Sequence, residues 1–271
     1  MDGGDASDEN AEIFHNAVID LILTKGVHSI ICWIRMKIEP IKRPGEMPMS
    51  EILENGELSE SITIADPKFG SYHLVLLAIF FAALLWSFIN PYDRFTWWLE
   101  VFPSLIGIPL LAFTYKKFPF TRLVYALILA HAIILLIGGH YTYAREPFFG
   151  WLSRVFDWPR NNYDKLGHFA QGFVPAMIAR EFLLRKSPLR RGAMLFFLVV
   201  CVCGALSAAY ELFEWLVAVF SGSSANDFLG EQGYGWDTQT DMLMAFIGAI
   251  SAQLFLSKLQ DRQLLRLKNP E

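Results

Sequence analysis

Residues 193–219 read AMLFFLVVCVCGALSAAYELFEWLVAV, an apolar run that contains two acidic residues, Glu211 and Glu214. A transmembrane helix needs about 20 predominantly apolar residues, so this run is long enough to cross a bilayer. More stretches of this kind lie between residue 73 and residue 257, separated by polar loops. The sequence therefore predicts an all-α, polytopic bundle of six transmembrane helices, at 73–90, 96–115, 122–139, 164–184, 193–219 and 238–257.

The composition also indicates a membrane protein. Of the 271 residues, 54% are hydrophobic and only 18% are charged, whereas soluble domains carry about 25% charged residues. The net charge of −4 gives no indication of a nucleic-acid partner, so we expect membrane lipid to be the partner of this surface. The three cysteines do not form the pattern of a disulfide framework.

Residues 1–70 differ from the rest of the chain. They begin with an acidic stretch, and 13–34 has apolar residues at helical spacing that charges interrupt, which is typical of an amphipathic helix lying on a membrane. Residues 39–70 are rich in Pro, Glu and Ser and indicate a linker. We therefore expect a cytoplasmic extension at 1–70, the six-helix transmembrane domain at 71–260 and a cytoplasmic tail at 261–271.

Basic residues set the expected orientation. They are concentrated in the second and fourth loops and in the C-terminal tail, and positively charged loops stay cytoplasmic, so we expect both termini inside. Arg180 and Glu181, with the basic residues at 185–191, are then interpreted as a cytoplasmic face that meets anionic lipid. The tryptophans predict an interfacial belt at the outer surface: Trp86, Trp97, Trp98, Trp151, Trp158, Trp215 and Trp236.

Ionisable side chains fall inside several of the predicted helices. Such residues are costly in a bilayer and usually face a bundle interior or a cavity. Asp164, His168 and Gln171 share one helix face through their spacing of four and three residues, and Glu211 shares a face with Glu214. The predicted topology brings seven ionisable residues to the outer leaflet: His140, Asp164, His168, Glu211, Glu214, Asp237 and Asp241.

Five carboxylates close together in a low-dielectric site repel one another, so something must compensate their charge. The candidates are shared protons, a basic partner such as Lys165, or a bound divalent metal ion. Imidazole with carboxylate suits zinc, iron or manganese, whereas a shell of oxygen atoms alone suits magnesium or calcium. A metal ion bound here can turn a water molecule into a nucleophile.

The metal hypothesis gives each of these residues a role. The expected roles are metal ligand for Asp164, His168, Glu211, Asp237 and Asp241, general base for Glu214 or His140, and support of the ligands for Gln171, Tyr143 and Tyr163.

Simpler interpretations stay open. An aspartate at the start of a helix commonly caps it, which applies to Asp164 and Asp237. Glu214 lies near the interface, where it suits a solvated position, and His131 suits a packed, hydrogen-bonded histidine. Tyrosines at the interface commonly act as anchors, which applies to Tyr141, Tyr143 and Tyr163.

Four stretches carry a resemblance to a known family: GHYTYA at 139–144, NYDKLGHFAQGFVP at 162–175, ARE at 179–181 and WDTQTDM at 236–242. Through them the chain resembles, from about residue 73 to residue 258, the YjdF family of bacterial inner-membrane proteins, a family without a settled activity. The resemblance implies a helical fold and a multi-pass protein of the bacterial cell (inner) membrane.

A more distant similarity is to VanZ-like proteins, which are associated with glycopeptide-antibiotic resistance. It rests on Asp164-Lys165, His168-Phe169, a later Glu211 and then Asp241. Where VanZ-like proteins often have a glutamine soon after this glutamate, the chain has Glu214.

Three classes of function are compatible with these residues. The first is a metal-dependent enzyme acting on a lipid or lipid-linked envelope molecule at the outer leaflet, where the positive ends of two helix dipoles favour an anionic head group. The second is an ion-coupled transporter, because buried carboxylates commonly relay protons or cations, although no internal repeat is visible. The third is a non-catalytic membrane factor in which the polar cluster joins the helices.

Overall fold

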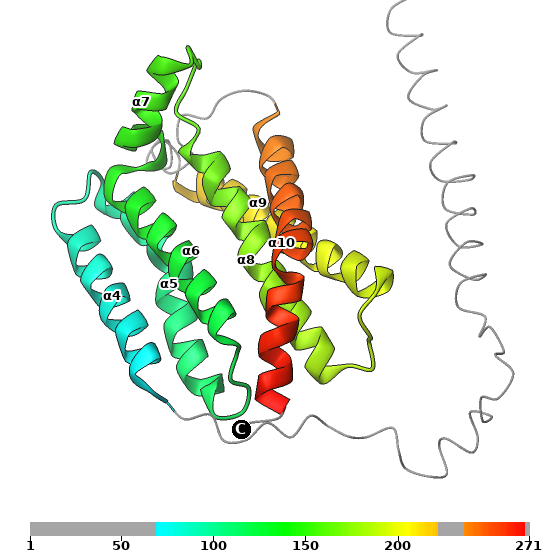
Figure 1. The fold of residues 1–271 in the computed structure, drawn as a ribbon. Coiled ribbons are helices and arrows are strands. Elements are labelled where there is room, and N and C mark those ends of the chain that lie inside the picture. Colours follow the sequence, from blue (N-terminus) through cyan, green and yellow to red (C-terminus); the bar gives the residue numbers. More distant parts are fainter. Residues whose placement is uncertain (1–68, 222–235, 269–271) are drawn as a thin grey trace, which may run out of the picture. The chain divides into compact units, whose positions relative to one another are not determined.

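The computed structural model describes residues 69–221 and 236–268, and the regular structure of this part is entirely helical (Figure 1). The expected amphipathic helix at 13–34 and the linker up to residue 68 lie outside the described residues. The helices in chain order are α4 (Ser71–Phe88), α5 (Arg94–Tyr115), α6 (Arg122–Tyr141), the 3₁₀ turn η2 (Tyr143–Arg145), α7 (Pro147–Val155), α8 (Tyr163–Lys186), α9 (Ala193–Ser221) and α10 (Asp237–Lys268). The prediction of an all-α bundle is confirmed.

Each predicted helix is present and starts at or within one turn of the predicted residue. The largest difference is in α10, which continues to Lys268 rather than ending at residue 257. Within the described residues, α4, α5, α6, α9 and α10 are long and apolar enough to cross a membrane. At 24 residues α8 is also long enough, but it carries charged residues near both ends. The count of six spans and the orientation of the termini therefore stay predictions.

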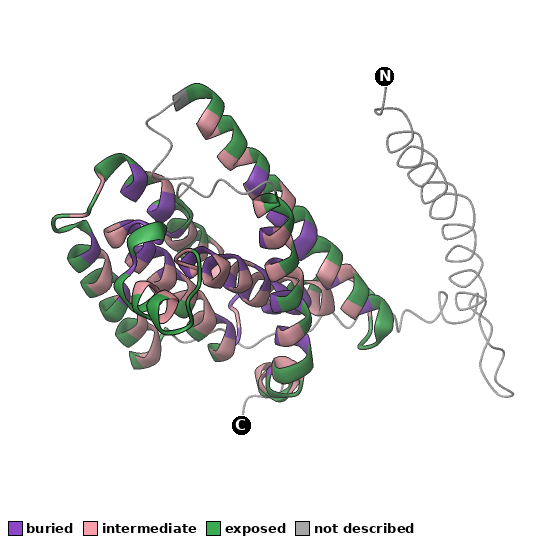
Figure 2. Ribbon diagram, turned by 90° about the horizontal axis from the view of Figure 1, so that it is seen from above, coloured by how far each residue is buried: buried purple, intermediate pink, exposed green. Residues whose placement is uncertain are grey.

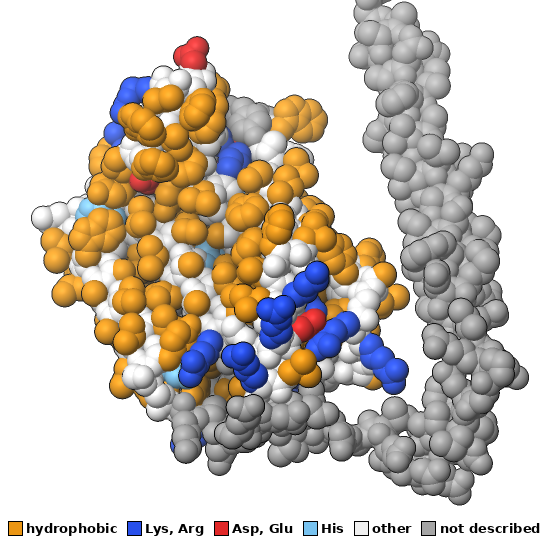
Figure 3. Space-filling view, viewed as in Figure 1, with side chains coloured by type: hydrophobic (Ala, Val, Ile, Leu, Met, Phe, Trp, Pro, Cys, Tyr) orange, Lys and Arg blue, Asp and Glu red, His pale blue; other side chains and the backbone are white. Residues whose placement is uncertain are grey.

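The outside of the bundle is apolar. Large hydrophobic side chains point outward along the helices, and Phe113 of α5 is 83% exposed. Figure 2 shows that buried residues lie on the inner faces of the helices. On the face seen in Figure 3, hydrophobic side chains cover the middle, while Lys and Arg side chains gather towards the two ends. Such a surface fits a bilayer, where lipid chains contact the apolar belt and head groups contact the charged ends.

Helix α8, which carries charged residues near both ends, lies in the middle of the bundle (Figure 1). It packs most extensively against α10 and also contacts α9 and α6, while α4 and α5 pack against α6. Two glycines allow the close approach of α8 and α10, because a Cβ on Gly172 would collide with the carbonyl oxygen of Ala245 and one on Gly248 with that of Phe169. Small residues commonly bring membrane helices together in this way. Polar residues of α8 are thereby held away from lipid.

A polar network joins the C-terminal half of α8 to its neighbours, and we name it the Glu181 cluster (Thr121, Arg180, Glu181, Arg185, Gln260 and Asp261). Glu181 is 0% exposed, and its carboxylate accepts hydrogen bonds from Thr121 N (3.0 Å), Thr121 Oγ1 (2.8 Å) and Arg185 (2.8 Å). Arg180 is 5% exposed and donates to Gln260 Oε1 and Asp261 Oδ1, each at 2.9 Å. The expectation that Arg180 and Glu181 form a lipid-facing basic surface was wrong, because both side chains are enclosed by α6 and α10.

The prediction of an interfacial position was also wrong for one tryptophan of the belt. Trp97 is buried, and its indole N–H donates to Ser87 Oγ at 2.9 Å, while the Ser87 hydroxyl donates to the carbonyl oxygen of Leu136 at 2.6 Å. Trp97 therefore joins α4, α5 and α6 instead of marking the interface. The other tryptophans of the predicted belt are exposed: Trp86, Trp98, Trp151, Trp158, Trp215 and Trp236.

Candidate functional site

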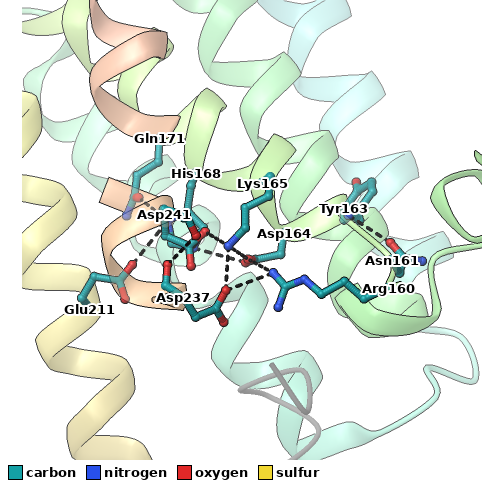
Figure 4. Close-up of polar contacts among 11 residues, drawn as sticks. Arg160, Asn161, Tyr163, Asp164, Lys165, His168, Gln171, Glu211, Asp237 and Asp241 are labelled. Atoms are coloured by element: carbon teal, nitrogen blue, oxygen red, sulfur yellow. Dashed lines mark hydrogen bonds and ion pairs between the residues drawn. The ribbon is translucent and has the colours of Figure 1, made fainter. Parts of the chain in front are cut away.

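Three helices bring ionisable side chains together at the N-terminal end of α8 (Figure 4). The first two turns of α8 supply an aspartate, a lysine and a histidine, α9 supplies two glutamates near its C-terminal end, and the first two turns of α10 supply two aspartates. The seven residues are named the His168 cluster: Asp164, Lys165, His168, Glu211, Glu214, Asp237 and Asp241.

His168 contacts an acidic residue from each of the three helices. Its side chain is 4% exposed, and Nε2 lies 3.2 Å from Asp164 Oδ1 and 3.8 Å from Asp241 Oδ1. The other ring nitrogen, Nδ1, lies 3.0 Å from Gln171 Oε1 and 3.7 Å from Glu211 Oε1. Both nitrogens thus face oxygen acceptors, so the imidazole can act as a double donor or, when deprotonated on one nitrogen, as a cation ligand.

The three aspartates of the cluster form ion pairs with two basic side chains. Lys165 Nζ lies 2.7 Å from Asp237 Oδ1, 2.6 Å from Asp241 Oδ1 and 3.4 Å from Asp164 Oδ2. Arg160, in the loop before α8, lies 3.0 Å from Asp237 Oδ1 and 3.8 Å from Asp164 Oδ2. A basic partner, one of the three forms of compensation that the sequence suggested, therefore serves this side of the cluster.

The two glutamates of the cluster, Glu211 and Glu214, have no ion pair of this kind among the described residues. Glu211 Oε1 is buried and has no hydrogen-bond partner among the described residues. Its closest ionisable contact is His168 Nδ1 at 3.7 Å, and Glu214 lies beside the same imidazole. Within the described part of the chain, no Lys or Arg forms an ion pair with either glutamate. A buried carboxylate oxygen without a hydrogen bond is unfavourable, so Glu211 Oε1 suits a proton or a cation.

Two overlapping sets of side chains have the spacing of metal ligands. One is Asp164, His168 and Asp241, the other is His168, Glu211 and Glu214, and in each set the ligand atoms lie within 4.8 Å of one another. Ligands bound at about 2 Å to one ion lie at most about 4 Å apart, so either set needs only small side-chain movements. A metal ion at the first set would compete with the ammonium group of Lys165, whereas no Lys or Arg among the described residues pairs with the glutamates of the second set.

The remaining predicted ligand and base residues lie differently. Asp237 belongs to neither set of ligands and instead pairs with Lys165 and Arg160. His140 is not brought to the cluster: its Nδ1 contacts the carbonyl oxygen of Ser87 at 3.1 Å, and its ring stacks on Trp86 at 4.5 Å between centroids. These contacts are with α4, so the position of His140 does not support the role of general base.

The capping interpretation of Asp164 is wrong. The residue at the N-cap of α8 is Asn162, and the Tyr163 N–H is bound by Asn161 Oδ1 at 2.9 Å. Asp164 lies in the first turn, where its carboxylate turns to His168 and the basic residues. Asp237 likewise opens α10 but pairs with side chains of other segments.

Two tyrosines interpreted as possible interfacial anchors are buried instead. Tyr163 donates to the carbonyl oxygen of Ile134 at 2.8 Å. Tyr143 packs against Gly138 so closely that a Cβ there would collide with its ring, and it hydrogen-bonds Glu100. Burial and the nearby Glu100 carboxyl raise the pKa of Tyr143 well above its usual value, so its hydroxyl remains a donor. Both tyrosines therefore pack between α6 and α8.

Glu100 of α5 was missed by the sequence analysis. It is buried, forms a hydrogen bond with Tyr143, and lies within electrostatic reach of Asp164 and His168. The signal was present, because Glu100 is a single acidic residue within the apolar stretch that follows Trp97. It adds one more carboxyl group to the surroundings of the His168 cluster.

Comparison with known proteins places the chain in a family. Residues 72–262 match the family described as "Predicted membrane protein (DUF2238)". The chain belongs to the DUF2238 family. The inner membrane protein YjdF of Escherichia coli (strain K12) is 48% identical to it over 183 residues, which cover 68% of this chain and 88% of that protein. No solved structure matches.

The family match covers the whole polar core. The range 72–262 includes every residue of the His168 cluster and of the Glu181 cluster. With its apolar helices and its inner-membrane relative, this DUF2238 protein is a multi-pass protein of the bacterial inner membrane. The resemblance to the YjdF family is confirmed, whereas the similarity to VanZ-like proteins stays an expectation from the sequence.

Proposed function

We propose that this DUF2238 protein is a membrane enzyme that binds a divalent metal ion at His168, Glu211 and Glu214 and acts on a lipid or lipid-linked envelope molecule. The observation that carries the proposal is Glu211 Oε1, a buried carboxylate oxygen without a hydrogen-bond partner among the described residues. Leaving a buried acceptor unpaired costs about 1–3 kcal/mol, and more for a charged group. A cation shared with His168 and Glu214 offsets that cost.

The surroundings of this site suit an anionic head group. Arg160 and Lys165 lie beside the proposed ligands with part of their side chains exposed, at 25% and 16%. The first turns of α8 and α10 lie close together, because Lys165 of α8 pairs with Asp237 and Asp241 of α10. The positive ends of helix dipoles favour phosphate or carboxylate. A metal ion bound there would polarise a phosphoryl or ester oxygen or activate water for attack.

A non-catalytic function is the second candidate, and a separate observation favours it. Lys165 and Arg160 form ion pairs with three aspartates, which offsets most of their charge without a metal ion. In that case the cluster joins α8, α9 and α10 as a structural network.

Metal analysis of the purified protein distinguishes the two candidates. The protein in mild detergent is equilibrated with Mn²⁺ or Zn²⁺, desalted and analysed for metal, together with His168→Ala, Glu211→Gln and the matched control Glu181→Gln, which alters a buried glutamate of the other cluster. We expect one metal ion per chain in the wild type and in Glu181→Gln, and none in the two site variants. A folded wild-type protein that retains neither metal would overturn the proposal in favour of the structural role.

A further inference from the structure

A cavity of about 390 Å³ lies between α4, α5, α6 and α8. Its walls are mainly apolar, and they extend along one face of α5 from Ser104 through Gly107 and Leu111 to Tyr115. The volume falls within the range of roughly 300–1,000 Å³ typical of pockets for small ligands. No residue of the His168 cluster lines this space, so an occupant is independent of the proposed function.

Two polar side chains line the cavity near the middle of the membrane. At a rise of about 1.5 Å per residue, His131 lies about 14 Å from the start of α6 at Arg122, and Ser104 lies about 16 Å from the end of α5 at Tyr115. Half the thickness of a hydrocarbon core of about 30 Å is about 15 Å. Because α5 and α6 are long and apolar enough to span a membrane, we expect both side chains at the depth of lipid tails, far from the head groups.

Neither polar side chain has a hydrogen-bond partner among the described residues. Ser104 is 8% exposed, and its Oγ is unpaired there. No hydrogen bond of the His131 imidazole is found in the described part of the chain, although the sequence suggested a packed, hydrogen-bonded histidine. Unpaired donors at this depth are unfavourable, and an ionisable residue inside a membrane commonly marks a ligand or ion site. These two groups therefore suit a ligand that brings hydrogen-bond acceptors into the cavity.

The depth of the two donors decides which class of ligand fits. A carboxylate or phosphate is costly in the middle of a bilayer, which disfavours the head group of a fatty acid or a polyprenyl phosphate at this point. The ester carbonyls of a phospholipid lie beside its head group, about 15 Å from the midplane. The ring of an isoprenoid quinone is uncharged and dissolves in hydrocarbon, and its two carbonyl oxygens point in opposite directions. It therefore matches donors that come from two different helices, α5 and α6.

We propose that the cavity binds the ring of an isoprenoid quinone of the membrane, with one ring carbonyl accepting a hydrogen bond from the His131 imidazole. The Ser104 hydroxyl is the donor to the second carbonyl, which it reaches by rotating to another staggered χ1 rotamer, because its Oγ is buried. The start of the isoprenoid tail contacts apolar side chains such as Ile108, Leu111 and Leu129. Binding alone is proposed, without electron transfer.

Substitutions at two positions test the hydrogen bond and the space on which binding depends. His131→Leu removes the ring nitrogens and keeps an apolar side chain, whereas His131→Gln keeps an N–H donor. Gly107→Phe fills the cavity, because Gly107 lines it and a Cβ added there meets nothing within 4 Å. Leu110 of the same helix is 59% exposed, so Leu110→Phe is the matched control.

The experiment uses the full chain in quinone-free nanodiscs of phosphatidylethanolamine and phosphatidylglycerol, titrated with decylubiquinone. Bound quinone is extracted and measured relative to nanodiscs without protein. We expect one saturable site per chain in the wild type and in Leu110→Phe, and no such site in folded Gly107→Phe. The affinity should fall about tenfold in His131→Leu, which corresponds to about 1.4 kcal/mol of binding free energy, and less in His131→Gln. Infrared spectra of the bound quinone should show a ring-carbonyl band at lower frequency than in free quinone, and His131→Leu should move it back.

Each other outcome has a definite meaning. Absence of saturable binding to the wild type, or equal affinity in the wild type and folded Gly107→Phe, overturns the quinone site. A carbonyl band that His131→Leu leaves unchanged overturns the role of His131 in it. Displacement of the quinone by an equal concentration of palmitate or undecaprenol would assign the cavity to another lipid and overturn the proposal. Folded Gly107→Phe should keep the metal content of the wild type, so the result for the cavity is separate from the result for the metal site.

Discussion

The two polar clusters on α8 contain the same kinds of residues but differ in how completely their groups are paired. At the Glu181 cluster, both carboxylate oxygens of the buried glutamate accept hydrogen bonds from Thr121, and Arg185 and Gln260 add further donors. At the His168 cluster, the buried Glu211 Oε1 has no such donor among the described residues. A fully paired network holds helices together, whereas an unpaired acceptor beside a histidine is what a ligand site requires.

The largest expected effect lies at the paired cluster. Glu181→Ala should lower the free energy of unfolding by about 3–5 kcal/mol, because it leaves Arg185 and the Thr121 donors without their buried acceptor. Unfolding by denaturant in detergent micelles measures the change. Arg191→Ala is the control, because Arg191 pairs with Asp261 while half exposed, and its loss should cost less than about 1 kcal/mol. A cost below about 1 kcal/mol for Glu181→Ala would remove the contrast between the clusters.

Lys165→Ala tests the aspartate side of the His168 cluster. It should destabilise the metal-free protein by roughly 2 kcal/mol, less than a fully buried pair because the ammonium is partly exposed. The affinity for Mn²⁺ should rise at the same time, since a positive charge next to the ligands is removed. Stability by denaturant and affinity by titration are both required, and an unchanged stability together with weaker metal binding contradicts the assignment.

His140→Ala should have a smaller effect. Loss of the stacking on Trp86 and of the contact with Ser87 is expected to cost about 1 kcal/mol, and metal content should stay unchanged. Loss of the metal from this variant would place His140 at the site after all.

The smallest change in stability is expected for Glu211→Gln. In metal-free protein this variant should be within about 0.5 kcal/mol of the wild type, or more stable, because it removes the charge of a buried carboxylate whose Oε1 has no hydrogen-bond partner among the described residues. Glu181→Gln, measured alongside, should lose clearly more. An equal loss of unfolding free energy in the two variants would mean that both clusters stabilise the fold to the same extent.

The spacing of residues within one helix was predictable, and the pairing between helices was not. Apolar length located the helices, and the four-residue spacing put Asp164 and His168 on one face. Periodicity does not say which neighbour a face meets, so nothing in the sequence directed His140 to α4 or the carboxylate of Glu181 to Thr121. Proximity to the same end of the membrane is therefore a weaker predictor of a shared site than a shared helix face.

Burial was the other property that composition did not resolve. Charged residues near a helix end suit a solvated or lipid head-group surface, yet Arg180 and Glu181 are enclosed because α10 continues past residue 257 and covers them with Gln260 and Asp261. Glu100 could have been predicted, because a lone acidic residue in an apolar span usually faces the bundle interior.

X-ray absorption spectroscopy on the Zn²⁺-loaded protein tests the proposed metal site. We expect a first shell of one imidazole nitrogen with carboxylate oxygens, at about 2.0–2.2 Å, from His168, Glu211 and Glu214. This signal should disappear in Glu211→Gln and persist in Glu181→Gln. A shell without imidazole, or one that Glu211→Gln leaves intact, would contradict it.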